Sequence, residues 1–222
     1  MTMNNLKIKV CGMRDPVNIT GVVAANPDFL GFIFYPKSKR FVGFKPSPEV
    51  LAVVPDSVKK VGVFVNENPE NVLQVRASWD LDAVQLHGNE SPEICNHLKH
   101  NGLIVIKAFS IDESFDFDTL KEYCDSCDYF LFDTKGLLPG GTGQKFNWQL
   151  LNKYHLENPF FLSGGISPDD IGAINEFNHL MLFGIDINSG FEISPALKDI
   201  GKVQRFISEI RKYNSEIIIN QL

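Results

Sequence analysis

Cys11 is the residue of this 222-residue chain with the clearest potential for chemistry. It ends the first apolar run, in Lys9-Val10-Cys11-Gly12, and a helix start at Asp15-Pro16 follows. A thiol at the tip of a strand, beside a glycine that lets a ligand approach the backbone, can act as a base or nucleophile. A buried cysteine can also be a small apolar core residue. The local sequence leaves both interpretations open.

Asp133 is a second candidate, because it ends the apolar run Tyr129-Phe130-Leu131-Phe132. A carboxyl group at a strand end can donate a proton as a general acid, although it can also cap the following turn. The glycine-rich loop that follows, residues 136–143, is predicted to close over a substrate and exclude water. Its residues Gly141, Thr142 and Gly143 are predicted to contact that substrate.

Arg40 and His87 are candidate substrate-binding residues. Arg40 follows Lys37-Ser38-Lys39, and its planar guanidinium suits a carboxylate or a phosphate, although it could be a solvated loop charge. His87 directly follows the apolar run 82–86 and could be a site residue or a structural one.

Two glycine- and serine-rich segments near the C-terminus are predicted to bind phosphate. They are Ser163-Gly164-Gly165 and the segment 184–192, both of which follow apolar runs and offer backbone N–H groups. The spacing of Ser189 and Glu192 predicts a short helix with a capping box. Tight turns alone would also explain the glycines. The predicted phosphate-binding residues are Gly164, Gly165, Asp186, Asn188, Ser189 and Gly190.

Eight apolar runs rich in β-branched and aromatic residues are predicted to be strands. They span residues 6–11, 29–35, 59–65, 82–86, 103–108, 128–132, 159–163 and 181–187. Several are continuously hydrophobic, which is typical of parallel strands buried on both faces.

A cap residue followed by proline recurs between these strands and predicts helix starts. The pairs are Asp15-Pro16, Ser47-Pro48, Asn68-Pro69, Ser91-Pro92 and Ser167-Pro168. Strand–helix alternation of this kind favours an α/β fold, a single-domain (β/α)₈ TIM barrel over residues 1–213, with a final helix at about 198–213 and a tail at 214–222. A doubly wound open sheet is the alternative, but its usual glycine motif after the first strand is absent.

Composition narrows the function classes. The chain is 44% hydrophobic, 22% charged and carries a net charge of −6, which argues against nucleic-acid or membrane-surface binding. The Cys124-x-x-Cys127 spacing has no second pair or histidine cluster, so no metal is expected. Without a signal peptide's apolar core or a membrane-length run, the protein is predicted to be cytoplasmic with reduced thiols.

Taken together, these motifs resemble the phosphoribosylanthranilate isomerase family of tryptophan biosynthesis. The matching segments follow the family's order over nearly the whole chain: residues 7–13, 31–34, 38–42, 62–66, 84–88, 131–134 and 140–143, Phe146, Trp148, and residues 163–166 and 184–192.

The resemblance implies an Amadori rearrangement of N-(5-phosphoribosyl)anthranilate, a small phosphosugar, without a cofactor. It implies that Asp133 is the general acid and that Cys11, as thiolate, is the general base. It further implies that Arg40 binds the anthranilate carboxylate while the loops near the C-terminus hold the phosphate.

One departure from the family pattern is Asn188, where family members frequently carry serine; an amide donor could replace that hydroxyl. A histidine-pathway isomerase of similar fold would carry aspartate in place of Cys11. A non-catalytic phosphosugar-binding barrel is the other alternative, against which Cys11, Arg40 and Asp133 argue together. The family includes both monomers and homodimers, so the resemblance leaves the oligomeric state open.

Overall fold

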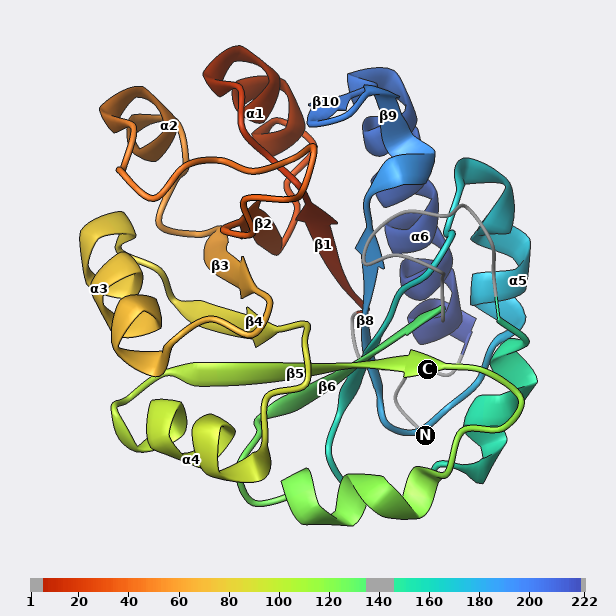
Figure 1. Cartoon of the computed structure of the whole chain (residues 1–222). Helices are drawn as coiled ribbons and strands as arrows, with labels where there is room; N and C mark the ends of the chain where they lie inside the picture. Colours follow the sequence, from red (N-terminus) through yellow and green to blue (C-terminus); the bar gives the residue numbers. More distant parts are fainter. Residues whose placement is uncertain (1–5, 135–145, 221–222) are drawn as a thin grey trace.

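A closed barrel of parallel strands forms the centre of the molecule (Figure 1). The computed structural model describes residues 6–134 and 146–220, so Gly141, Thr142 and Gly143 lie outside the described residues. The barrel strands are β1 (Lys7–Cys11), β2 (Phe29–Ile33), β3 (Lys59–Phe64), β4 (Ala83–Leu86), β5 (Ile104–Ile111), β6 (Tyr129–Thr134), β7 (Phe160–Leu162) and β8 (Leu182–Ile187). The predicted TIM barrel is confirmed.

Side chains alternate between the inside and the outside of the barrel along each strand. In β6, Leu131 points into the barrel, whereas Phe130 and Phe132 pack outward under the surrounding helices. The inner cluster of buried side chains consists of Val61, Ala83, Ile106, Ala108, Leu131 and Phe161. This cluster fills the barrel, so a ligand can enter only at an end.

Aromatic side chains close the amino-terminal end of the barrel. Phe183 lies edge-on to Phe161 with ring centroids 5.2 Å apart, and 4.5 Å from the ring of Tyr129. Phe29 completes the group at 5.5 Å from Phe161. The opposite end, where the strands terminate, is therefore the open one.

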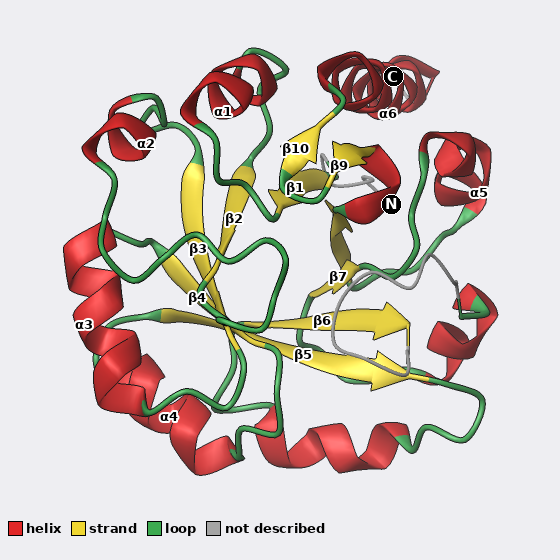
Figure 2. Cartoon of the chain, turned by 45° about the horizontal axis from the view of Figure 1, so that its top comes forward, coloured by secondary structure: helices red, strands yellow, loops and turns green. Residues whose placement is uncertain are grey.

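Helices surround the barrel, as Figure 2 shows. They are α1 (Pro16–Val23), α2 (Pro48–Ala52), α3 (Pro69–Trp79), α4 (Pro92–His100), α5 (Ile171–Glu176) and α6 (Ile200–Asn220). The predicted proline starts of α1 to α4 are confirmed, since each proline occupies the first turn. Asp15 caps α1 by accepting a hydrogen bond from the Asn18 N–H at 2.7 Å. None of the described helices is long and apolar enough to cross a membrane.

The connections that follow β5, β6 and β7 differ from the predicted α-helices. The segments η1 (Phe117–Tyr123), η2 (Trp148–Lys153) and η3 (Pro168–Asp170) are 3₁₀ helices, and η3 leads directly into α5. Asn, Asp, Thr and aromatic residues are frequent in η1 and η2, and these residue types have low helix propensity.

Two further differences concern the C-terminal quarter. Ser189 opens only the single 3₁₀ turn η4 (Ser189–Phe191), after which Glu192 starts a hairpin of β9 (Glu192–Ser194) and β10 (Leu197–Lys198). The predicted capping box does not form, because the Glu192 carboxylate binds Arg40 and Lys198 instead. Helix α6 continues to Asn220 beyond the predicted end at 213, since no proline or glycine follows Gly201.

Candidate active site

A cavity lies at the carboxyl ends of the barrel strands, where the sequence predicted the functional residues to converge. It is lined by Cys11, Ile33, Tyr35, Ser38, Val63, Val65, Gln85, His87, Asp133, Ser163, Gly164, Gly165, Ile166, Asp186, Asn188 and Ser189. Residues far apart in the chain are thus brought to one opening, including both of the proposed proton-transfer groups. Arg40 and Gly190 are not part of this lining.

Cys11 lies at the end of β1 beside a buried ion pair. Lys9, two residues earlier on the same inward face, contacts Asp186 of β8 with Nζ and Oδ1 2.9 Å apart. Burial works to lower the pKa of Lys9, but Asp186 and Cys11 together outweigh it and hold that pKa above its ordinary value. An ammonium ion is therefore held in the barrel interior, next to the thiol.

The Cys11 thiol is almost fully buried, with 4% of the residue exposed. Burial raises the pKa of the Cys11 thiol, while the positive charges of Lys9 and Lys198 limit that rise. The Asp186 carboxylate acts in the same direction as burial. The free thiol consequently keeps its proton at neutral pH more firmly than an exposed cysteine does.

Asp133 is held by the backbone of Thr134 and by His87. Its Oδ1 accepts a hydrogen bond from the Thr134 N–H at 2.8 Å, and its Oδ2 lies 3.3 Å from Nε2 of His87. The amide Nε2 of Gln85 donates to Nδ1 of His87 at 2.8 Å, which places the proton of a neutral ring on Nε2, facing Asp133. The Oε1 atom of Gln85 is buried without a partner.

The loops after β7 and β8 form the glycine-rich wall of the cavity. Gly164 has a φ of 91°, and a Cβ atom there would lie 2.3 Å from Oγ1 of Thr134 and 2.9 Å from Oδ1 of Asp133. Only glycine allows this loop to approach the end of β6 so closely. A Cβ on Gly190 would lie 2.3 Å from the Ile166 carbonyl oxygen, so the two loops pack together.

Asp186, predicted to contact phosphate, lines the cavity, and its buried carboxylate is paired with Lys9, with Nζ and Oδ1 2.9 Å apart. It lies next to Cys11 in the barrel interior. The other predicted phosphate-binding residues lie in the two loops, with Gly190 behind the wall rather than on it.

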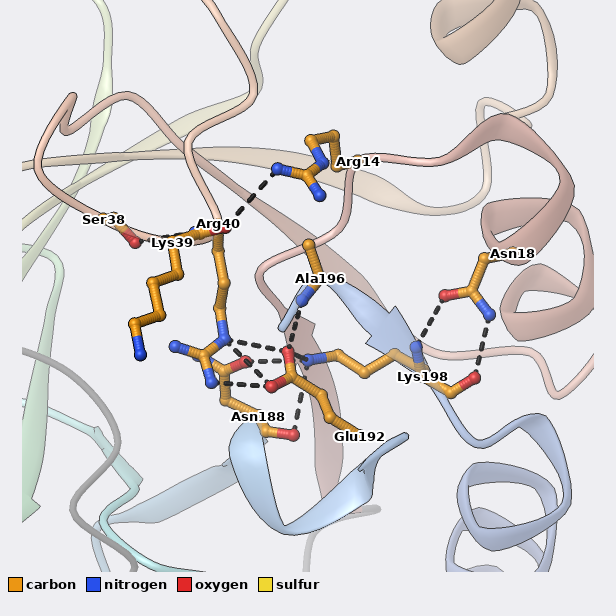
Figure 3. Close-up of polar contacts among 9 residues, drawn as sticks. All are labelled: Arg14, Asn18, Ser38, Lys39, Arg40, Asn188, Glu192, Ala196 and Lys198. Atoms are coloured by element: carbon orange, nitrogen blue, oxygen red, sulfur yellow. Dashed lines mark hydrogen bonds and ion pairs between the residues drawn. The ribbon is translucent and has the colours of Figure 1, made fainter. Parts of the chain in front are cut away.

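Arg40 faces Glu192 above the first strand, as Figure 3 shows. Its Nε donates to Oε1 of Glu192 at 2.8 Å, and its Nη2 donates to Oε2 at 2.6 Å. Lys198 approaches the same carboxylate from the other side, with Nζ 2.8 Å from Oε1, and also donates to Oδ1 of Asn188 at 2.7 Å. The loop after β2 and the loop after β8 are thereby joined.

Four residues of this site were not predicted from the sequence: Lys9, Gln85, Glu192 as a partner of Arg40, and Lys198. Lys9 and Gln85 could have been identified from the sequence, because a charged or amide side chain inside a buried strand requires a partner. Lys198 could not, since its sequence surroundings resemble those of any surface lysine.

The described residues contain no group of three or more histidine, cysteine or acidic side chains that could hold a metal ion. Cys124 and Cys127 instead contact neighbouring oxygen atoms, the Leu120 carbonyl at 3.6 Å and the Ser126 hydroxyl at 3.8 Å. All four cysteines are free.

A (β/α)₈ barrel with a thiol, a carboxyl group and glycine-rich loops around one cavity at its strand ends has the architecture of a barrel enzyme. Residues 8–209 match the family of N-(5'-phosphoribosyl)anthranilate (PRA) isomerase. An N-(5'-phosphoribosyl)anthranilate isomerase of Parabacteroides distasonis is 50% identical over 204 residues, covering 91% of this chain and 92% of that protein. The chain therefore belongs to the phosphoribosylanthranilate isomerase family.

Solved structures agree with this assignment. A phosphoribosyl anthranilate isomerase in complex with reduced 1-(o-carboxyphenylamino)-1-deoxyribulose 5-phosphate superposes with a TM-score of 0.78 at 30% identity, covering 93% of this chain and 99% of that one. Monomers generated from the dimeric isomerase of Thermotoga maritima give a TM-score of 0.77 at 30% identity, with 92% and 98% covered. The fold and the family are thus established independently.

Proposed function

We propose that this enzyme converts N-(5-phosphoribosyl)anthranilate into 1-(2-carboxyphenylamino)-1-deoxyribulose 5-phosphate, with Asp133 as general acid and Cys11 as general base. The observation that supports these roles is that both side chains line one cavity, whose wall is built from the loops after β7 and β8. The reaction needs only proton transfers between positioned groups, so the side chains of the cavity suffice.

In the first step, Asp133 donates a proton to the ring oxygen of the ribose. The bond between that oxygen and C1 breaks, and the nitrogen lone pair forms a C1=N double bond. The position of His87, 3.3 Å from the Asp133 carboxylate, supports a role in orienting the acid. Gln85 in turn holds the His87 ring through Nδ1 at 2.8 Å.

In the second step, the Cys11 thiolate removes the proton from C2, which the adjacent C=N bond has made acidic. The C–H electrons form a C1=C2 double bond, and the C=N electrons return to nitrogen. The resulting enolamine takes up a proton at C1 and loses the proton of its C2 hydroxyl, which gives the ketone. Lys9 and Lys198 favour the thiolate electrostatically, which supports Cys11 in this role.

Two anchors would hold the sugar between acid and base. Backbone N–H groups of Gly164, Gly165 and Ser189 would bind the phosphate, because glycine-rich turns expose such donors. Ile33, Val63 and Val65 give the cavity an apolar side suited to the aromatic ring. Arg40 would bind the anthranilate carboxylate, as a guanidinium forms paired hydrogen bonds with carboxylates.

We further infer that the enzyme is a cytoplasmic monomer or homodimer. Four free cysteines are typical of a reducing compartment. The related isomerase of Thermotoga maritima is dimeric, which supports the homodimer as one of the two states.

A fluorescence assay with freshly prepared phosphoribosylanthranilate tests the function. The parent enzyme should consume the substrate and form the carboxyphenylamino-deoxyribulose phosphate. Asp133→Asn, which cannot donate the acid proton, should lower kcat about 10²- to 10⁴-fold with an unchanged circular dichroism spectrum. Binding of the product without any turnover by folded parent protein would instead identify a non-catalytic phosphosugar-binding barrel.

A further inference from the structure

Glu192 lies between two cations (Figure 3), one of which, Lys198, also binds the cavity-lining Asn188. Arg40 contacts it through Nε and Nη2, and Lys198 contacts it through Nζ at 2.8 Å. The three side chains are largely shielded from water, with 13% of Arg40, 5% of Glu192 and none of Lys198 exposed. Water screens the attraction between such shielded charges only weakly, and removal of one partner would leave an unpaired buried charge.

Burial lowers the pKa of Lys198, and the Glu192 carboxylate opposes that shift. Burial works to raise the pKa of Glu192, but the hydrogen bond from Arg40 and the charge of Lys198 outweigh it, so that pKa lies below its ordinary value. Glu192 is therefore ionised at neutral pH. Because Lys198 neutralises Glu192, the positive charge of Arg40 remains available to attract an anion.

The contact with Glu192 also fixes the plane of the Arg40 guanidinium. Glu192 occupies the Nε–H and one Nη2–H of Arg40. The N–H groups left for a ligand are the two on Nη1 and the second one on Nη2. The aliphatic part of Arg40 packs over Gly12, where a Cβ atom would lie 2.7 Å from its Cδ. The guanidinium is thus held beside the residue that follows Cys11.

Lys198 has its own anchor in the first helix. The Asn18 side chain donates to the Lys198 carbonyl at 2.9 Å and accepts from the Lys198 N–H at 2.8 Å. Asn18 is itself buried in α1. The chain of contacts therefore runs from a rigid helix through Lys198 and Glu192 to Arg40.

We propose that Glu192 is a positioning residue that sets the specificity of the enzyme for substrates with a carboxylate on the aromatic ring. It orients Arg40 toward that carboxylate, and Lys198 preserves the net positive charge needed to attract it. This inference rests on the proposed function, specifically on Arg40 as the carboxylate ligand. Glu192 does not touch the reacting atoms in this account.

The test compares two substrates, phosphoribosylanthranilate and phosphoribosylaniline, which differ only in the carboxylate. For each variant, the ratio of the two kcat/KM values measures recognition of the carboxylate. Arg40→Ala should lower this ratio about tenfold to a hundredfold, as expected for loss of a charged hydrogen bond. Glu192→Gln should lower it at least about fivefold, mainly by raising KM for the anthranilate substrate.

Glu209→Gln is the matched control, since it removes a carboxylate from an exposed position on α6 and should leave the ratio unchanged. A Glu192 with a merely structural role would lower both kcat/KM values equally, and an unchanged or increased ratio in Glu192→Gln overturns the proposal. If that variant does not fold, Glu192→Asp replaces it. Aspartate keeps the negative charge, but its side chain is one methylene shorter and places the carboxylate farther from Arg40, so the ratio should fall as well.

The same ratios distinguish a failure of the carboxylate-binding role of Arg40 from a failure of the positioning role of Glu192. If Arg40→Ala leaves the ratio at the parental value, Arg40 does not bind the carboxylate, and the positioning role of Glu192 fails with it. If Arg40→Ala lowers the ratio and neither Glu192 variant does, the function of Arg40 stands and only the inference about Glu192 is overturned.

Discussion

At the scale of single residues, the protonation of Cys11 decides whether it can act as the proposed base. The thiol is buried, so its ground state is the neutral form, although two ammonium groups act to stabilise the thiolate. A base that is mostly protonated in the free enzyme can still function, because a positioned base needs only a small thiolate fraction. Because the thiolate fraction depends on pH, the rate should depend on pH as well.

We therefore predict that kcat/KM rises with pH. The Cys11 pKa lies above its ordinary value, about 8.5, so the active thiolate increases roughly tenfold per pH unit below that point and saturates only above it. The measurement is kcat/KM between about pH 7 and pH 10, in buffers of constant ionic strength. A profile that is flat over this range, or that saturates well below about pH 8, would contradict the assignment of Cys11 as base.

At the scale of the elements, the strand next to β1 makes room for the thiol. Gly31 of β2 pairs with Cys11 in the sheet, and a Cβ atom on Gly31 would lie 2.7 Å from the Cys11 Sγ. Real Cβ atoms do not approach so closely, so any side chain at position 31 must displace the thiol. Glycine at position 31 is needed for the position of the Cys11 thiol.

Gly31→Ala should consequently lower kcat about tenfold to a hundredfold, since a small displacement of a catalytic group has effects of this size. Overpacking should also destabilise the fold by about 1–3 kcal/mol. Gly172→Ala in α5 is the control, because its Cβ would meet nothing within 4 Å. Steady-state kinetics and urea unfolding of both variants make the comparison, and parental kcat in Gly31→Ala would show that the thiol is not so constrained.

The sequence predicts the elements well where one local signal dominates. Proline after a cap residue marks the starts of α1 and α3, and continuous apolar runs mark the barrel strands. It fails at Glu192, because the same spacing that suits a capping box also occurs where a distant cation binds the carboxylate. Arg40 stands 152 residues away from Glu192, so no local pattern could reveal the pair.

At the scale of the whole molecule, closure of the barrel creates the site. Strand β8 pairs with β1, and this places Asp186 against Lys9 across 177 residues of sequence. The predicted TIM barrel implied that strand ends would meet, which is why Cys11 and Asp133 could be predicted together. The partners of Lys9 and Arg40 depend on register and rotamers, which the pattern of residues does not encode.

The central claim is that Cys11 is the base that removes the C2 proton, and turnover of phosphoribosylanthranilate by Cys11→Ala tests it most directly. Loss of the base should lower kcat about 10²- to 10⁴-fold while the circular dichroism spectrum and the binding of the product remain close to those of the parent. A folded Cys11→Ala enzyme with kcat within a few-fold of the parent would contradict the account.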